Sequence, residues 1–220
     1  MSYPIQLDVD GMQIVVIGGG SVAERRIERL LTEGAKVRVV APEVTDWIAQ
    51  RASEGAIVHA SRRFRAGDID DARLAFAATD NPDVNRKVAE EARSRKVFVN
   101  VADRSTDGDF SVPAVADLDP VRLAIDTGGA SPALAGKLRR HLESTVDPGW
   151  GRAAEILGRL RADAVSKLET DTRRRFFREL VDSLPEALTG DTPDALAWLA
   201  DAARNAGVEP DTFDWQSYIQ

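Results

Sequence analysis

Residues 13–23 read QIVVIGGGSVA, a short apolar run that leads directly into three glycines. The β-branched run predicts a buried strand, and the residues after the glycines predict the start of a helix. The spacing G-x-G-x-x-A is typical of loops that hold a dinucleotide. Gly18 would form the tight turn, Gly20 would let backbone amides approach a pyrophosphate, and Ala23 would let the helix pack closely on the sheet. A tight glycine turn without a ligand is the alternative.

The alternation of short apolar runs and amphipathic stretches continues to about residue 101. Five of these runs are expected to be strands: 13–17, 36–41, 56–59, 74–78 and 97–101. The first helix is expected to end at Glu33-Gly34, because glycine readily takes the left-handed conformation. Asn81-Pro82 predicts another helix start, since Asn caps free amides and Pro suits the first turn. Repeated strand–helix units predict an α/β fold of the Rossmann type, with a parallel sheet.

The pattern changes after residue 100. Two extended segments are expected over 110–115 and 121–126, and residues 128–132 precede a helix. Three leucines recur in that helix at a spacing of four and are expected to face the core: Leu134, Leu138 and Leu142.

The rest of the chain is helical by pattern, over about 151–169, 171–184 and 192–206, and the aromatic tail is expected to pack back on these helices. We therefore expect three parts: a nucleotide-binding sheet domain over residues 1–112, a short middle segment over 113–147 and a helical C-terminal domain over 148–220.

The amino-acid composition limits the kinds of reaction and ligand that the chain can support. The 220 residues are 43% hydrophobic and 30% charged, the balance of a soluble globular chain. The absence of cysteine excludes disulfides, iron–sulfur clusters, Cys-ligated zinc and thiolate catalysis. His59 and His141 are the two histidines, too few for a His-rich metal cage. The net charge of −7 disfavours general binding to nucleic acid or to anionic membranes.

The N-terminal residues lack the cationic start and long apolar run of a secretory signal. No stretch approaches the roughly 20 apolar residues of a membrane span. We expect a cytoplasmic protein without a metal site, a nucleic-acid partner or a membrane partner.

Ten residues are candidates for binding the dinucleotide, because they lie in the glycine loop or at the carboxyl ends of predicted strands: Gly18, Gly20, Ser21, Val22, Ala23, Pro42, Glu43, Thr79, Asp80 and Asn100. Glu43 comes slightly late after the second strand for the acidic residue that binds the adenine ribose. No Arg follows there to receive a 2′-phosphate, so NAD is favoured over NADP. Asp80 has an equal alternative role in the turn before Asn81.

Asp103 follows the fifth predicted strand, at the end of the run Val99-Asn100-Val101-Ala102-Asp103. A carboxylate at the carboxyl end of a central strand, beside a dinucleotide, would be placed to accept a proton. The alternative is that Asp103 only starts the following loop as a turn residue.

Four motifs occur in series: Gly18 to Arg26 (GGGSVAERR), Ala77 to Asn81 (AATDN), Asn100 to Asp103 (NVAD) and Thr127 to Ala135 (TGGASPALA). Together they resemble the precorrin-2 dehydrogenase and sirohydrochlorin ferrochelatase family, the N-terminal part of siroheme synthase. The motifs span about residues 10–145, and residues 150–220 are similar to the family only in helix content.

The resemblance implies a Rossmann domain, a middle segment used for dimerisation and a helical C-terminal domain, in a homodimer. It also implies the oxidation of precorrin-2 to sirohydrochlorin with NAD, and in some members the insertion of Fe²⁺ to give siroheme. The family's catalytic aspartate falls on Asp103. The residues themselves leave iron insertion open, since the chain offers no preassembled iron cage.

The tetrapyrrole that the resemblance implies bears many carboxylates, so an acidic chain would need local cations and anion-binding amides. The candidates for substrate binding are Arg104, Ser131, Lys137, Arg140 and His141. A solvated helix face explains the cluster at 137–141 equally well, and helix capping alone would explain Ser131. A different class of function also stays open, that of a regulatory Rossmann domain that senses a dinucleotide without catalysis.

Overall fold

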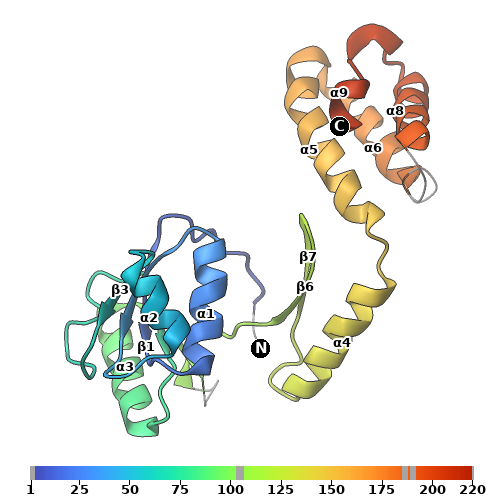
Figure 1. Cartoon of the computed structure of the whole chain (residues 1–220). Coiled ribbons are helices and arrows are strands. Elements are labelled where there is room, and N and C mark those ends of the chain that lie inside the picture. Colours follow the sequence, from blue (N-terminus) through green and yellow to red (C-terminus); the bar gives the residue numbers. More distant parts are fainter. Residues whose placement is uncertain (1–2, 103–106, 185–187, 189–191, 220) are drawn as a thin grey trace. The chain divides into compact units, whose positions relative to one another are not determined.

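The computed structural model describes residues 3–102, 107–184, 188 and 192–219. Contacts within the chain divide it into two compact units, Met1–Val112 and Pro113–Gln220. Figure 1 shows the first unit in blue to green and the second in yellow-green to red.

The first unit contains a parallel sheet of five strands in the order β3-β2-β1-β4-β5. The strands are β1 Gln13–Ile17, β2 Lys36–Val40, β3 Ile57–Ala60, β4 Leu74–Ala77 and β5 Phe98–Val101. All five predicted strands are confirmed to within about two residues. Because β1 lies between β2 and β4, the chain order reverses beside it, and ligands of doubly wound sheets bind in the crevice at such a point.

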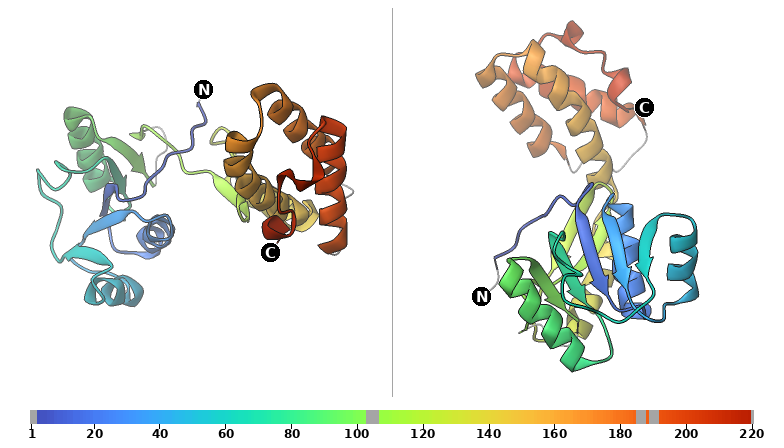
Figure 2. Two further views of the ribbon diagram at one scale, coloured as in Figure 1. Left: turned by 90° about the horizontal axis from the view of Figure 1, so that it is seen from above. Right: turned by 90° about the vertical axis from the view of Figure 1, so that its left-hand side faces the viewer.

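Helices cover both faces of this sheet. α1 (Ser21–Thr32) and α2 (Asp46–Ser53) lie on one face, and α3 (Pro82–Arg95) lies on the other (Figure 2). The four buried apolar residues of β1 alternate between the two faces of the sheet. Ile14 and Val16 lie under α1 and α2, and Val15 and Ile17 lie under α3. Each such buried side chain contributes about 1.5–3 kcal/mol of apolar transfer free energy, which fixes the register of β1.

Local signals explain where two of these helices begin. Asn81 caps α3 by accepting from the amides of Asp83 and Val84, at 2.9 and 3.3 Å, as its sequence context predicts. Thr45 caps α2 by accepting from the amide of Ile48 at 3.4 Å. α2 is only eight residues long and was not among the predicted helices.

The second unit begins with an antiparallel hairpin, β6 (Ala114–Leu118) and β7 (Val121–Ile125). The extended segment expected from residue 110 therefore starts later. Phe110 instead packs edge-on against Phe76 of β4, with their ring centroids 5.5 Å apart. It extends the core of the first unit.

The described part of the second unit contains the helices α4 Pro132–Thr145, α5 Gly149–Lys167, α6 Thr170–Asp182, α8 Thr192–Ala206 and α9 Gln216–Ile219, with a 3₁₀ turn at Pro210–Thr212. A core of buried aliphatic and aromatic side chains joins them from α5 onward, and it includes Leu160, Phe176 and Leu199. Phe213 and Tyr218 are buried in it, so the prediction that the aromatic tail packs back is confirmed. Among the described residues, no helix is both long and apolar enough to cross a membrane.

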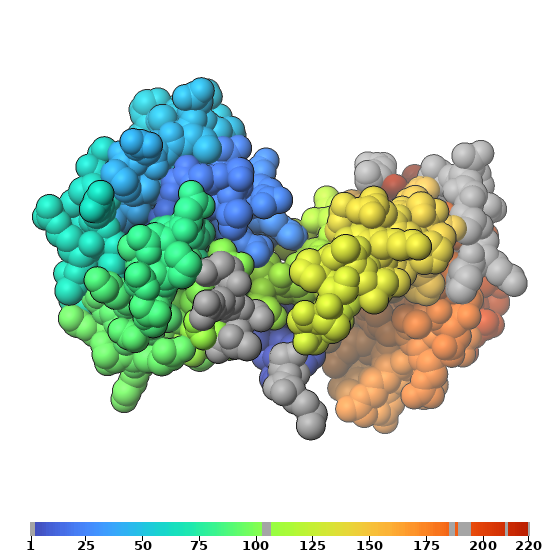
Figure 3. Space-filling view, turned by 90° about the horizontal axis from the view of Figure 1, so that it is seen from below, coloured from blue at the N-terminus to red at the C-terminus, as the bar shows by residue number. Residues whose placement is uncertain are grey.

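The leucine stripe of α4 does not face a core, contrary to the prediction. Leu134 is 48% exposed and Leu138 is 38% exposed, and Ala135 is the α4 residue that is buried. Within its unit α4 packs on the two-stranded hairpin of β6 and β7, and this packing leaves Leu134 and Leu138 exposed and Leu142 half-buried. Figure 3 shows α4, in yellow, at the surface of its unit.

Candidate functional site

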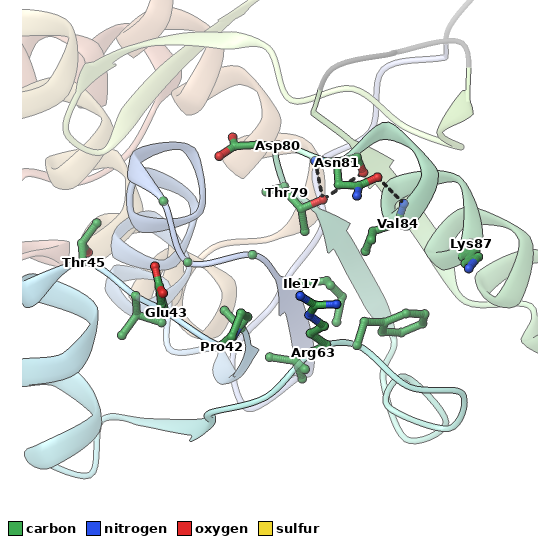
Figure 4. Close-up of a pocket in the computed structure, with 18 residues that line it drawn as sticks. Ile17, Pro42, Glu43, Thr45, Arg63, Thr79, Asp80, Asn81, Val84 and Lys87 are labelled. Atoms are coloured by element: carbon green, nitrogen blue, oxygen red, sulfur yellow. Dashed lines mark hydrogen bonds between the residues drawn. The ribbon is translucent and has the colours of Figure 1, made fainter.

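A pocket of about 780 Å³ opens at the carboxyl ends of β1, β2 and β4 in the first unit (Figure 4). Its lining comes from the glycine loop, the β2–α2 loop, the β3–β4 connection and the start of α3: Ile17–Gly20, Val40–Thr45, Arg63, Phe64, Ala78–Asn81, Val84 and Lys87. This position is the crevice that the strand order predicts for a ligand.

The glycine loop is held tightly on two sides and is open on the third. A Cβ on Gly18, which has φ +127°, would lie 2.2 Å from the carbonyl oxygen of Ala78 in β4's extension. A Cβ on Gly19 would lie 2.1 Å from the carbonyl oxygen of Glu43. A Cβ on Gly20, by contrast, would meet nothing within 4 Å. Gly18 and Gly19 therefore allow the fold, whereas Gly20 leaves room for a ligand next to the backbone.

Helix α1 starts at this open place. Gly20 is its N-cap and supplies no side chain to bond the first amides. The first amides of a helix lack intrahelical partners and attract anions, which is how such helices bind a pyrophosphate. Ser21 and Val22 are exposed in the first turn, and Ala23 is fully buried against the sheet, so the helix can approach β1 closely.

The β2 side of the pocket is formed by Pro42 and Glu43, as the sequence predicted for cofactor-binding residues. Hydrogen bonds fix this loop: the Thr45 amide donates to the Gly19 carbonyl at 3.0 Å, and the Ser61 hydroxyl donates to the Pro42 carbonyl at 3.4 Å. Glu43 therefore lines the pocket from a loop that hydrogen bonds hold in place, three residues after the end of β2.

The β4 side is formed by Thr79, Asp80 and Asn81. Thr79 is held by Asn85, which is 1% exposed. The Asn85 side-chain oxygen accepts from the Thr79 hydroxyl at 2.7 Å and from its amide at 3.2 Å, and the Asn85 amide group donates to the Thr79 carbonyl at 3.0 Å. Asn85 is therefore a positioning residue that the sequence analysis missed, although its place one turn into α3 is readable from Asn81-Pro82.

Two cationic residues of the lining, Arg63 and Lys87, were also missed. Both side chains are exposed. Figure 4 shows the guanidinium of Arg63 directed from the β3–β4 connection into the pocket. No sequence motif identifies Arg63 or Lys87 as pocket residues, because both are distant in sequence from the glycine loop. The order of the strands in the sheet brings them close to that loop.

The remaining predicted residues lie elsewhere. Asn100 is 7% exposed and donates to the Phe110 carbonyl at 2.9 Å, and it does not line the pocket. Asp103 and Arg104 lie outside the described residues; β5 ends two residues before Asp103 in the sequence.

Four predicted substrate-binding residues belong to the second unit. Ser131 caps α4 by accepting from the Leu134 amide at 3.1 Å. Lys137, Arg140 and His141 are exposed on α4. In the described part of the chain, His, Asp and Glu side chains form no group of three or more that could hold a metal ion.

Comparisons with known proteins agree with this geometry. Residues 5–114 match a family model described as "Putative NAD(P)-binding". The chain is 36% identical over 209 residues to siroheme synthase of Chromobacterium violaceum, a match that covers 94% of this chain and 43% of that protein. It is 34% identical over 214 residues to siroheme synthase of Nitrosococcus oceani, covering 96% and 46%. The chain thus spans less than half the length of these relatives.

The solved structure of SirC, a precorrin-2 dehydrogenase, is similar to this chain with a TM-score of 0.78 and 25% identity. The alignment covers 92% of this chain and 100% of that one. The predicted fold class, a Rossmann sheet followed by a small segment and a helical region, is confirmed. The chain belongs to the precorrin-2 dehydrogenase family that SirC shares with the N-terminal part of siroheme synthase, and its residues 5–114 are an NAD(P)-binding domain.

Proposed function

We propose that this protein oxidises precorrin-2 to sirohydrochlorin with NAD, in the biosynthesis of siroheme. The observation that carries the proposal is the open space at Gly20, beside the uncapped start of α1, in a chain similar along nearly its whole length to SirC and to siroheme synthase. The residues present fit a dinucleotide, since a side chain at this glycine would fill the space that a pyrophosphate needs.

NAD is proposed as the cofactor on the strength of Glu43. A carboxylate at the end of the second strand bonds the ribose 2′-hydroxyl of NAD and repels a 2′-phosphate. When bound, the dinucleotide supplies a hydride acceptor for the two-electron oxidation.

The protein's own task is then to orient the cofactor and to take up the proton that the substrate loses with the hydride. Thr79, fixed by Asn85, and Asp80 would orient the nicotinamide half, because they follow β4 on the opposite side of β1 from Glu43. Asp103 is proposed as the proton acceptor, because the family's aspartate falls on it and it follows β5 in the sequence. Arg104, Ser131, Lys137, Arg140 and His141 are proposed to bind the substrate's carboxylates.

Two further proposals come from the family. The first is that Fe²⁺ is inserted into sirohydrochlorin as a second reaction. The second is a homodimer, and the exposed Leu134 and Leu138 of α4 support it, since contiguous apolar surface on a soluble unit commonly marks a protein interface.

The experiment is to mix the purified chain anaerobically with enzymatically made precorrin-2 and NAD, with and without Fe²⁺. Sirohydrochlorin and NADH should form together, and Fe²⁺ should convert the product to siroheme if the second reaction occurs. Asp103→Asn should bind NAD normally and lose turnover. A dinucleotide-sensing domain without catalysis, the second candidate, would bind NAD but give no NADH with either protein.

A further inference from the structure

Arg63 lines the pocket from the connection that follows β3. The glycine loop after β1 binds the pyrophosphate in this fold, and the adenosine half lies toward the second strand. β3 pairs with β2, and Arg63 follows β3 by three residues. Its side chain lines the same pocket as Pro42 and Glu43 (Figure 4).

The backbone that carries Arg63 is fixed by its neighbours. Arg62 binds the Asp68 carboxylate through both terminal nitrogens, at 2.8 and 2.6 Å, and donates to the Arg63 carbonyl at 3.2 Å. The Arg65 amide also donates to Asp68, at 2.7 Å. The Arg62 guanidinium holds the pKa of the Asp68 carboxyl below its usual range, so this clamp is intact at neutral pH. A fixed backbone reduces the entropy lost when the Arg63 side chain binds a ligand.

Arg63 and Glu43 place opposite charges in the pocket without cancelling each other. Among the residues that the structure describes, neither takes part in an ion pair. An unpaired carboxylate alone would repel a 2′-phosphate, whereas a guanidinium matches phosphate oxygens with two parallel hydrogen bonds. The loop directly after β2 contains no Arg, whereas the connection after β3 places the guanidinium of Arg63 in the same pocket.

We propose that Arg63 binds the ribose end of the adenosine moiety and lets the pocket accept a 2′-phosphorylated dinucleotide, NADP, beside NAD. The inference rests on the proposed function in that both dinucleotides use the same glycine loop. It goes beyond the proposed function because it assigns the acceptance of NADP to one residue, Arg63. It also implies that Glu43 does not fully exclude NADP.

The test is calorimetric titration of the full chain with NAD⁺ and with NADP⁺. The wild-type dissociation constants should lie within about tenfold of each other, and Arg63→Ala should weaken NADP⁺ about 10- to 100-fold while changing NAD⁺ about twofold at most. Arg63→Gln should behave similarly, because it keeps length without the charge. Arg65→Ala is the matched control, since Arg65 is an exposed arginine of the same connection that does not line this pocket, and it should change neither constant.

Three results would overturn the inference: wild-type protein that binds NAD⁺ but not NADP⁺, equal weakening of both ligands by Arg63→Ala, or equal weakening of NADP⁺ by Arg65→Ala. Protein that binds neither dinucleotide would overturn the inference and the proposed function together. Normal binding of both dinucleotides, with no oxidation of precorrin-2, would overturn only the proposed function.

Discussion

Replacing Gly20 with alanine should weaken dinucleotide binding about tenfold or more while leaving the fold intact. Gly20 has φ −86° and ψ −172°, which alanine adopts without strain, and its Cβ would meet no atom within 4 Å. The added methyl would occupy the space between the first amides of α1 and a pyrophosphate. Gly18→Ala should instead destabilise the fold, because the added methyl would collide with the backbone of Ala78.

The expected magnitudes separate the two variants. At an N-cap, alanine is less favourable than glycine by up to about 1 kcal/mol, and the reduced freedom of the unfolded chain offsets about 0.4–1 kcal/mol of this, so Gly20→Ala should be nearly neutral for stability. Loss of one charge-assisted hydrogen bond to phosphate, about 1.5–3 kcal/mol, would weaken NAD by about tenfold or more. Gly18→Ala adds a strained conformation of about 1–3 kcal/mol and a contact of 2.2 Å with Ala78, so a loss of at least about 3 kcal/mol is expected.

Both variants can be measured by urea unfolding and by NAD titration, with wild type as the reference. Gly20→Ala should unfold at nearly the wild-type midpoint and bind NAD much more weakly. Gly18→Ala should unfold at clearly lower urea. A Gly20→Ala protein that binds NAD within twofold of wild type would refute the placement of the pyrophosphate at this glycine.

Other parts of the molecule give further predictions. Asn85→Ala should lower the free energy of unfolding by about 2–4 kcal/mol and weaken NAD binding, because it removes three hydrogen bonds that hold Thr79. Urea unfolding and NAD titration test this, and unchanged stability would contradict it. Asp68→Asn should destabilise the protein at neutral pH, and its difference in stability from wild type should shrink below about pH 4. The pKa of Asp68 is lowered in the folded protein, so its ionised carboxylate stabilises the fold above the ordinary pKa of an aspartate. This contribution is lost as the pH falls through the folded-state pKa. A difference that does not shrink as the pH is lowered would contradict a contribution from the ionised carboxylate. Size-exclusion chromatography with light scattering should show the proposed homodimer for wild type and a monomer for Leu134→Glu. A dimer that persists in Leu134→Glu would exclude Leu134 from the interface, and a monomeric wild type would contradict the proposed dimer.

The parallel sheet could be predicted because the sequence patterns that specify its strands are local. Five short apolar runs and the spacing of Gly18, Gly20 and Ala23 are enough to place β1, the turn and α1, and the four motifs indicate the family. The short helix α2 was missed because eight residues carry too little periodicity, and its cap at Thr45 was not recognised.

The pocket was only half predictable, because its other half depends on tertiary contacts. Thr79 follows a strand and could be selected from sequence, but the three bonds from Asn85 depend on how α3 lies on the sheet. Arg63 reaches the pocket through the pairing of β3 with β2, which no local pattern records. The exposure of Leu134 similarly depends on the size of the hairpin under α4, whereas periodicity gives only the apolar stripe.

The most direct measurement is a single-turnover reaction under anaerobic conditions, with the enzyme in excess over precorrin-2 and with NAD saturating. If the glycine-loop pocket serves the oxidation of the tetrapyrrole, NADH and sirohydrochlorin should rise at one rate and in equal amounts. Gly20→Ala should slow both and should recover partly at high NAD. Binding of NAD without either product, or sirohydrochlorin without equimolar NADH, would contradict the account.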